Sequence, residues 1–525
     1  MLVRYRIHGR CFVSRSGHRV ASISFLSTAM TLTFFKVRGF ATATRLFKPF
    51  KVAVIGTGPG GFYAAHHLLN KSSPDKRIHL DYFEKLPTPF GLSRYGVAPD
   101  HPEVKNCEEF MTDIMADFQS SERHRVRFIG NVEIGKDIEL KELEKNYNAI
   151  VLAYGCTSAD NKLNVPGTDQ PGVISARQFV NWYNGHPDCY SSKNPYTPPP
   201  LNKIEDVTII GNGNVALDVA RILLADPIQH WHATDISVEA EALLEKSTVK
   251  NVNIVARRGI LESAFSNKEI RELFELKDAK FEPLDEGLLD SVATKKLGRV
   301  EKRRVSLLEK YNKRIGSEGL SKRKWTLRYL LSPVEFLSSD EGIKATKFVK
   351  NEPINDPLLP GRVKATDESV EIKNELVILS IGYQGTSIKG FEEAGVWFED
   401  NKLHNRGGRV LSRESKGENK ENLTYKTGWY TSGWIKNGPK GVIAVTMMDS
   451  FDTAANILED LTNGNYIKVD EAKDITESDV FKSLQDVVYW DNWEKLNNYE
   501  LRKGKKLDKS RFKVCNKNDM IEICK

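Results

Sequence analysis

Two short glycine-rich segments, at residues 56–61 and 211–216, could each hold the pyrophosphate of a dinucleotide. In the first segment Gly56 permits a tight turn, Gly58 lets the backbone approach a phosphate, and Gly61 lets a helix pack closely on a strand. The second segment, G-N-G-N-V-A, is the variant with alanine in the third place. A pyrophosphate would lie at the positive end of the helix that each segment begins. Two such segments in one chain indicate two dinucleotides, with a hydride passing between them.

The residues after the next strand of each unit distinguish the two sites. Glu84 follows the apolar stretch 78–83. A carboxylate there accepts hydrogen bonds from an adenosine ribose and repels a 2′-phosphate, so the first site suits FAD or NAD. Arg257 and Arg258 follow the apolar stretch 252–256. Two guanidiniums can bind a 2′-phosphate through paired hydrogen bonds, so the second site suits NADPH; the alternative is a solvated basic turn.

Apolar, β-branched runs and helix-like segments predict strand–helix–strand units around both glycine segments. Strands are expected over residues 51–55, 78–83, 149–153, 207–210, 252–256 and 375–381. Helices are expected over residues 61–70, 215–224, 238–244 and 441–458. An insertion, residues 226–249, separates the second helix from its strand and must leave the sheet if Arg257 is to reach a nucleotide. The pattern predicts an α/β protein with two Rossmann-like dinucleotide-binding domains.

The first 40 residues contain seven Lys or Arg and no Asp or Glu, which accounts for the whole formal charge of +7. This composition predicts a mitochondrial transit peptide over residues 1–48, with processing near Arg38. The apolar run 21–35 leaves a secretory signal or membrane anchor as the alternative, although it is short for a membrane span. The remainder has no net charge, which argues against a nucleic-acid binder.

The cysteines argue against an internal electron acceptor. None of the six forms a C-x-x-C or C-x4-C pair, so neither a redox disulfide nor an iron–sulfur or zinc site is expected, and no metal is predicted. Electrons must therefore leave for an external acceptor. Residues 295–324 contain twelve Lys or Arg against three Glu and could receive an acidic carrier, with Lys302, Arg303 and Arg304 as candidate contacts; a solvated basic loop is the alternative.

Three longer strings resemble signatures of the adrenodoxin reductase family, mitochondrial ferredoxin–NADP reductases with a glutathione-reductase-like fold. They are F-G-L-S-R-Y-G-V-A-P-D-H-P-E-V-K-N at 90–106, G-N-G-N-V-A-L-D-V-A-R at 211–221 and G-W-I-K-N-G-P-K-G-V-I at 433–443. The resemblance extends from about Lys51 to Lys505. One departure is Gly60, where relatives often have alanine.

The resemblance implies site residues in three groups. FAD contacts fall at Gly60, Glu84, Leu92 and Val132, with Trp434, Gly441, Val442 and Ile443 beside the flavin ring. NADPH contacts fall at Asn212, Gly213, Asn214, Val215, Arg257, Arg258 and Glu269, with Gly441 shared. His101 and Asp218 match polar residues near the flavin that are candidates for proton handling.

Alternatives remain open for several of these residues. Trp434 could simply pack in the core, His101 could be a structural histidine, and Asp218 could cap or brace its helix. Gly441 begins the expected helix, so its N–H could polarise the pyrimidine edge of a flavin.

The expected function is NADPH:ferredoxin oxidoreduction through FAD. The resemblance implies an acidic [2Fe–2S] ferredoxin of the mitochondrial matrix, serving iron–sulfur cluster and heme A synthesis or a P450 chain, with peripheral association with the inner membrane. An FAD- and NADPH-dependent monooxygenase and a non-catalytic flavoprotein subunit are the alternatives. Since the first and third strings bracket the second, an NADPH domain is expected to be inserted in a discontinuous FAD domain. The expected divisions are residues 1–48 (leader), 49–155 and 375–470 (FAD domain), 156–374 (NADPH domain) and 471–525 (C-terminal extension).

Overall fold

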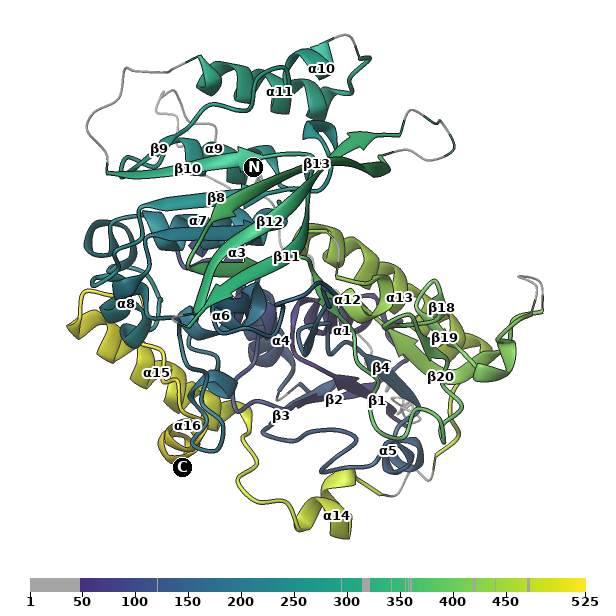
Figure 1. Cartoon of the computed structure of the whole chain (residues 1–525). Helices are drawn as coiled ribbons and strands as arrows, with labels where there is room; N and C mark the ends of the chain where they lie inside the picture. Colours follow the sequence, from purple (N-terminus) through teal and green to yellow (C-terminus); the bar gives the residue numbers. More distant parts are fainter. Residues whose placement is uncertain are drawn as a thin grey trace, which may run out of the picture. The chain divides into compact units, whose positions relative to one another are not determined.

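The computed structural model describes residues 48–525, apart from residues 120, 294, 314–321, 341, 355, 357, 359–360, 419–421, 440 and 470–472. The predicted transit peptide, residues 1–48, lies outside the described residues except for Lys48. Residues 47–525 form one unit, and Figure 1 shows its elements. None of the helices in the described ranges combines the length and apolar character that crossing a bilayer requires.

A seven-stranded sheet carries the first glycine segment. Its strand order is β18-β19-β20-β4-β1-β2-β3, and β20, β4, β1, β2 and β3 run parallel. Its strands are β1 (Phe50–Ile55), β2 (Ile78–Glu84), β3 (Arg125–Gly130), β4 (Ala149–Leu152), β18 (Asn405–Arg406), β19 (Arg409–Leu411) and β20 (Tyr425–Thr431). The largely buried, apolar runs of β1 and β4 suit a sheet that is covered on both faces. The sheet thus joins strands from two distant parts of the chain.

A six-stranded, wholly parallel sheet carries the second glycine segment, in the order β6-β14-β7-β8-β10-β9. Its strands are β6 (Val173–Ser175), β7 (Asp206–Ile210), β8 (Asn251–Val255), β9 (Ala279–Phe281), β10 (Arg323–Arg328) and β14 (Leu376–Leu379). A three-stranded antiparallel sheet of β11 (Leu331–Ser339), β12 (Gly342–Pro353) and β13 (Val363–Lys373) follows β10. Two-stranded pairs complete the strands: β5 (Ala159–Asp160) with β15 (Tyr383–Gln384), and β16 (Phe398–Glu399) with β17 (Lys402–Leu403).

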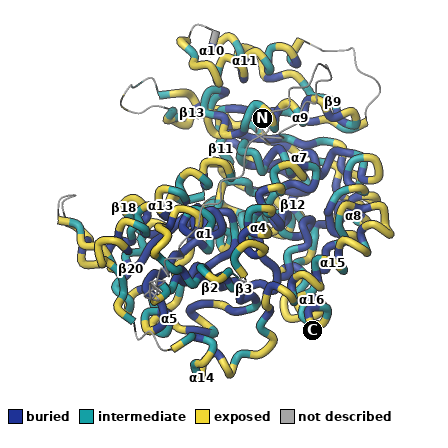
Figure 2. Tube along the Cα trace, turned by 180° about the vertical axis from the view of Figure 1, so that it is seen from behind, coloured by how far each residue is buried: buried dark blue, intermediate teal, exposed yellow. Residues whose placement is uncertain are grey.

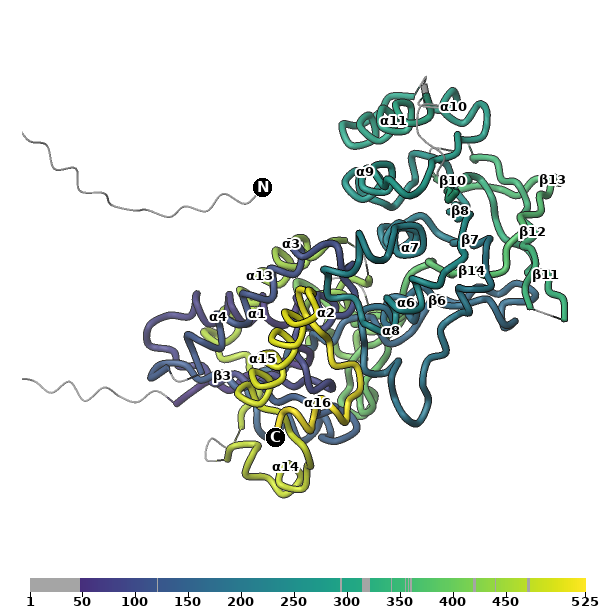
Figure 3. Tube along the Cα trace, turned by 90° about the vertical axis from the view of Figure 1, so that its left-hand side faces the viewer, coloured from purple at the N-terminus to yellow at the C-terminus, as the bar shows by residue number. Residues whose placement is uncertain are grey.

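Helices cover the two large sheets (Figures 1 and 3). Those associated with the first sheet are α1 (Pro59–Lys71), α2 (Leu92–Tyr95), α3 (Pro102–Lys105), α4 (Glu108–Phe118), α5 (Leu140–Asn146), α12 (Trp434–Asn437) and α13 (Ile443–Asn463). Those associated with the second sheet are α6 (Ala176–Tyr183), α7 (Asn214–Leu224), α8 (Val238–Leu244), α9 (Asn267–Phe274), α10 (Asp290–Ala293) and α11 (Arg299–Asn312). The chain ends with α14 (Asp479–Lys482), α15 (Trp490–Lys506) and α16 (Lys517–Cys524).

The expected α/β fold and the strand–helix–strand units are confirmed, with boundaries shifted by a few residues. Residues 226–249, all of which are described, contain a π-helical turn (Pro227–Trp231) and α8 but no strand, so this insertion does leave the sheet. The expected helix over 441–458 begins two residues later, at Ile443, with Val442 as its N-cap. The alternative that the basic run is a solvated loop does not hold for most of its described residues, because residues 299–312 form α11 and 323–328 form β10.

Candidate functional site

The first glycine loop joins β1 to α1, and each glycine has a geometric reason to lack a side chain. Gly56 has a φ of 100°, and a Cβ on it would lie 2.7 Å from Ala153 O. A Cβ on Gly61 would collide with Gly56 O, and one on Gly60 would lie 2.9 Å from the Cα of Gly433. A Cβ on Gly58 would meet no atom within 4 Å. Gly58 thus faces open space at the N-terminus of α1, as a phosphate-binding loop requires.

Glu84 ends β2 beside this loop and is 7% exposed. Its Oε2 accepts hydrogen bonds from Thr57 N at 3.1 Å and Thr57 Oγ1 at 2.7 Å, and its Oε1 accepts one from Leu86 N at 3.1 Å. These donors hold the carboxylate at the rim of the loop, where an adenosine ribose would approach.

A cavity of about 480 Å³ opens at this loop. The predicted site residues that line it are Gly56, Gly58, Gly60, Glu84, Leu92, Val132, Trp434 and Ile443. Trp434 begins α12, and its ring lies parallel to that of Tyr383 with centroids 6.0 Å apart. Gly441 and Val442 are exposed and do not line the cavity. The glycine cradle, the ribose-facing carboxylate and the aromatic wall together fit a flavin dinucleotide.

The second glycine loop repeats the geometry of the first. Gly211 has a φ of 116°, and a Cβ on it would collide with Ser380 O. A Cβ on Gly213, the N-cap of α7, would meet nothing within 4 Å. Asn214 Oδ1 accepts a hydrogen bond from Ser266 N at 2.8 Å and so ties the loop to the start of α9. Asn212 and Val215 are half-buried beside these residues.

Arg257 and Arg258 follow β8 after one intervening residue, and both side chains are exposed. Their backbone carbonyls accept hydrogen bonds from Asn351 Nδ2 at 2.9 Å and Leu330 N at 3.3 Å, respectively. Within the described residues, neither guanidinium pairs with a carboxylate. The chain therefore fixes the backbone of this turn and leaves two positive charges free for an anionic ligand.

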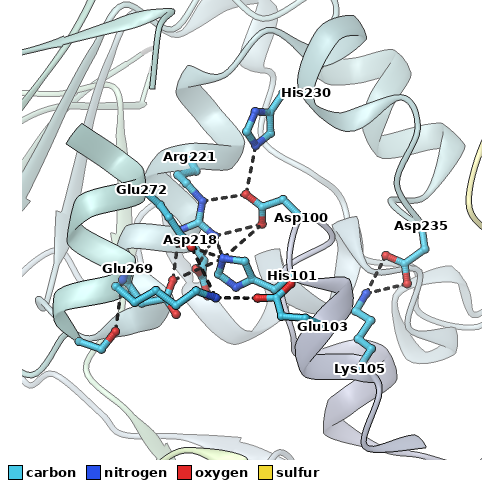
Figure 4. A network of polar contacts seen from close by, with 12 residues as sticks. Asp100, His101, Glu103, Lys105, Asp218, Arg221, His230, Asp235, Glu269 and Glu272 are labelled. Atoms are coloured by element: carbon cyan, nitrogen blue, oxygen red, sulfur yellow. Dashed lines mark hydrogen bonds and ion pairs between the residues drawn. The ribbon is translucent and has the colours of Figure 1, made fainter. Parts of the chain in front are cut away.

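His101, Asp218 and Glu269, which lie far apart in the sequence, meet in one polar cluster (Figure 4). His101 Nε2 lies 2.8 Å from Glu272 Oε2 and 3.7 Å from Glu269 Oε2. Burial is the largest cause of raised pKa values for two carboxyls: that of Asp218 rises to about 6 and that of Glu269, which also faces Asp218, to about 7. Both groups thus change protonation near neutral pH, as proton-handling groups should.

Arg221 occupies the centre of this cluster, and the sequence interpretation gave it no role. Its guanidinium donates two hydrogen bonds to Asp100, at 2.9 and 3.0 Å, and Nη2 lies 2.9 Å from Asp218 Oδ1. Nη1 lies 3.4 Å from Glu269 Oε2. Although burial opposes it, hydrogen bonds from His230 and Arg221 hold the pKa of Asp100 well below its usual range. The Asp-x-x-Arg spacing on one helix face was the available signal.

The three predicted docking residues lie on α11, but they do not share an environment. Lys302 and Arg303 are exposed. Arg304 is 7% exposed and donates a hydrogen bond to Leu261 O at 3.0 Å, and its guanidinium lies over the ring of Phe265. Burial lowers its pKa. The prediction that Arg304 contacts a partner is therefore wrong, since its side chain points into the core; Figure 2 shows the mixed burial of α11.

Comparisons with known proteins agree with this geometry. Residues 50–278 match the family described as pyridine nucleotide-disulphide oxidoreductase. The mitochondrial NADPH:adrenodoxin oxidoreductase of Salvelinus fontinalis is 38% identical over 94% of this chain and 94% of that protein. The human protein of the same name is 37% identical, over 90% and 91%. The structure of Mycobacterium tuberculosis FprA in complex with NADPH has a TM-score of 0.78 at 33% identity and covers 91% of this chain and 100% of that chain. The five cysteines in the described ranges are buried and unpaired.

Proposed function

This chain belongs to the mitochondrial NADPH:adrenodoxin oxidoreductase family, and from that membership we propose that it carries electrons from NADPH through FAD to an adrenodoxin-type ferredoxin. FAD, when bound, accepts a hydride from NADPH and releases electrons singly to a one-electron carrier. The observation that carries the proposal is the pairing of two open glycine loops, one followed by a buried carboxylate and the other by two unpaired arginines.

The first loop and its cavity hold the FAD. Gly58 leaves room for the pyrophosphate at the N-terminus of α1, and the carboxylate of Glu84 accepts hydrogen bonds from the ribose. Leu92 and Val132 supply apolar walls of the cavity, and Trp434 supplies an aromatic one. Ile443 lines the same cavity, whereas Gly441 and Val442 are placed beside the flavin ring by the family resemblance alone.

The second loop holds the NADPH. Gly213 leaves room for the pyrophosphate at the N-terminus of α7, with Asn212, Asn214 and Val215 beside it. Arg257 and Arg258 bind the 2′-phosphate, because each guanidinium is exposed and offers paired donors. This pair makes the site selective for NADPH over NADH.

The polar cluster handles protons next to the reacting ring. His101 and Asp218 are the groups that exchange a proton, and Glu269 contacts NADPH. His101 Nε2 lies 3.1 Å from Arg221 Nη2, which can only donate, and 2.8 Å from Glu272 Oε2, which as a carboxylate can only accept. One nitrogen cannot satisfy both neighbours at once.

Lys302 and Arg303 on α11 receive the ferredoxin. Both are exposed cations on a helix whose sequence is rich in basic residues. An acidic [2Fe–2S] ferredoxin would be steered there by charge, which makes the association fast and dependent on salt. Arg304 of the same helix is buried, so fewer cations are available for docking than the number of basic residues in the run suggests.

The relatives are mitochondrial by name, and we extend this to a matrix location with peripheral association with the inner membrane. The basic, acid-free leader supports import. We also propose an FAD domain over residues 49–155 and about 380–470, an NADPH domain over 156–379 and an extension over 471–525. The expected boundary at residue 375 moves because β14 pairs with β6 and β7 in the second sheet. The first sheet draws its strands from residues 50–152 and 405–431, and the second from 173–379.

One assay separates this function from that of a monooxygenase. Purified protein is given NADPH and cytochrome c, with and without a mitochondrial ferredoxin. We expect rapid cytochrome c reduction only when the ferredoxin is present. NADPH consumption that instead produces an oxygenated organic product, with no effect of ferredoxin, would contradict the proposal.

A further inference from the structure

The insertion at residues 226–249 is contacted by the far end of the chain. We call residues 509–516 the C-terminal strap. Lys509 Nζ lies 2.7 Å from Glu241 Oε2 and donates a hydrogen bond to His232 O at 2.9 Å. The side chains of Lys509 and Glu241 are 1% and 7% exposed. This ion pair is therefore buried between α8 and the strap, which lie side by side in Figures 1 and 3.

A second ion-pair group joins the insertion, the strap and the flavin side of the molecule. Lys513 Nζ lies 3.0 Å from Asp235 Oδ2 and donates a hydrogen bond to Arg94 O at 3.0 Å. Lys105 Nζ, at the end of α3, lies 2.6 Å from Asp235 Oδ2. Asp235 thus pairs with one lysine of α3 and one lysine of the strap. Burial lowers the pKa of Lys513 to about 7 against the opposing effect of Asp235.

The strap is itself anchored to the flavin side through α15. Arg94 Nη2 donates hydrogen bonds of 2.6 and 2.8 Å to both oxygens of Glu500, and the two side chains are 3% and 0% exposed. Trp493 packs edge-on against Phe90. A Cβ on Gly504 would lie 2.8 Å from the Cα of Arg511, so the strap turns back tightly against its helix. Through α15, the strap is therefore anchored to the core around the first sheet.

Breaking one partner of a buried ion pair is costly, and such pairs fix the geometry of the elements they join. The buried pairs of the strap join elements on opposite sides of the expected hydride transfer. Hydride transfer is sensitive to position, since a displacement of about 1 Å can lower a rate about 100-fold. The strap residues do not line the flavin cavity.

We propose that the C-terminal strap and the 226–249 insertion form a clasp that sets the position of the NADPH-binding sheet against the flavin-binding sheet. Lys509 and Lys513 are then positioning residues for hydride transfer and contact neither cofactor. This inference rests on the proposed function, because it assigns the clasp to the step between NADPH and FAD. It also gives the insertion and the C-terminal extension a role.

The test compares Lys509→Met with Lys505→Met in the flavin-loaded protein. Lys505 is exposed near the end of α15, four residues before Lys509, so its replacement is the matched control. Flavin content, NADP+ affinity, the rate of flavin reduction at saturating NADPH, and amide hydrogen exchange are measured. For Lys509→Met we expect flavin content and NADP+ affinity within about threefold of the control, flavin reduction slowed about 10-fold or more, and faster exchange across residues 226–249.

Glu241→Gln repeats the test with a smaller change, in case Lys509→Met loses its flavin. It keeps the shape of the acceptor and removes its charge. The charge-exchanged variant Lys509→Glu with Glu241→Lys should recover part of the rate. The clasp is excluded if flavin reduction and exchange match the control in the variants that retain flavin, or if every slow variant has lost flavin in proportion. If the wild type is itself not reduced by NADPH, the proposed function fails, whereas the exchange data still test the clasp.

Discussion

The two glycine loops share one backbone geometry and differ in what surrounds them. Gly58 and Gly213 are both N-caps with an extended backbone and open space where a Cβ would be. After the next strand, one unit places the buried Glu84 and the other places two exposed arginines. We therefore expect the glycines to determine that a dinucleotide binds, and the residue after the second strand to determine which one.

The units also differ in how the chain returns from helix to strand. In the first unit β2 begins seven residues after α1 ends, at Ile78 after Lys71, whereas the second unit inserts residues 226–249 before β8. The short return is bonded to residues 122–124 of the same unit. The long return carries His230, whose Nε2 lies 3.1 Å from Asp100 Oδ2. It also carries Asp235 and Glu241, which pair with Lys513 and Lys509 of the strap. The inserted segment therefore connects the two parts of the molecule that carry the glycine loops.

We expect the largest effect from replacing either of two glycines in the first loop, Gly58 or Gly61. Gly61→Ala forces a Cβ into Gly56 O, so we expect loss of bound FAD together with a fall in melting temperature. Gly58→Ala meets no protein atom, so it should lose FAD while the flavin-free protein keeps its own melting temperature. Flavin absorbance and thermal unfolding check both. Wild-type flavin content in Gly58→Ala would refute the open-loop interpretation.

The second largest effect that we expect is on the preference for NADPH over NADH. Replacing Arg257 and Arg258 with alanine removes two charge-assisted contacts, each contributing about 1.5–3 kcal/mol. We expect kcat/KM for NADPH to fall about 100-fold or more, with NADH changed less than about threefold. Lys324→Ala, at an exposed position on the neighbouring β10, is the control. A parallel loss for both nucleotides would remove the 2′-phosphate role.

A smaller effect distinguishes exposed from buried cations on α11. Lys302→Glu with Arg303→Glu should raise KM for ferredoxin about 10-fold at low salt, less at high salt, and leave ferricyanide reduction unchanged. Arg304→Met should instead lower the melting temperature, because it leaves buried carbonyls without a donor. The two assays are ferredoxin titration and thermal unfolding. An equal effect on ferricyanide would exclude a docking role for Lys302 and Arg303.

The smallest effect is on the pH dependence of stability. Asp218 and Glu269 have raised pKa values of about 6 and about 7 in the folded protein, so the folded state binds more protons than the unfolded chain. The stability they contribute is present below their ordinary pKa values and is lost as pH rises through 6 and 7. Glu269→Gln should therefore flatten the fall in melting temperature between about pH 5 and 8, by about 2 °C or more. An unchanged slope would mean that Glu269 does not bind this proton.

The parts of the site set by local backbone constraints could be predicted from sequence. The glycine loops, Glu84 and the arginine pair follow from turn geometry and from position at the end of a strand. Burial of Arg304 was also within reach, since Val305, Leu308 and Tyr311 are buried with it at helical spacing. The total charge of residues 295–324 does not reveal this periodicity.

The cluster and the clasp could not be predicted in the same way. Arg221 contacts Asp100, which is 121 positions away in the chain, and Lys513 contacts Arg94 across 419 positions. Such pairings depend on how the two sheets pack, for which a single sequence carries no local signal. In α15 the buried positions include a charged residue, Glu500, and a glycine, Gly504, beside Trp490, Trp493 and Leu496, so hydrophobicity alone does not mark the face that the helix buries.

Anaerobic stopped-flow spectroscopy of the purified protein tests the central claim most directly, because it follows both glycine loops in one electron path. Mixing with NADPH should bleach a bound yellow flavin, and oxidised ferredoxin added next should restore the colour in single-electron steps. A protein that purifies without flavin and fails to bind added FAD, or a flavin that NADPH leaves oxidised, would contradict the account.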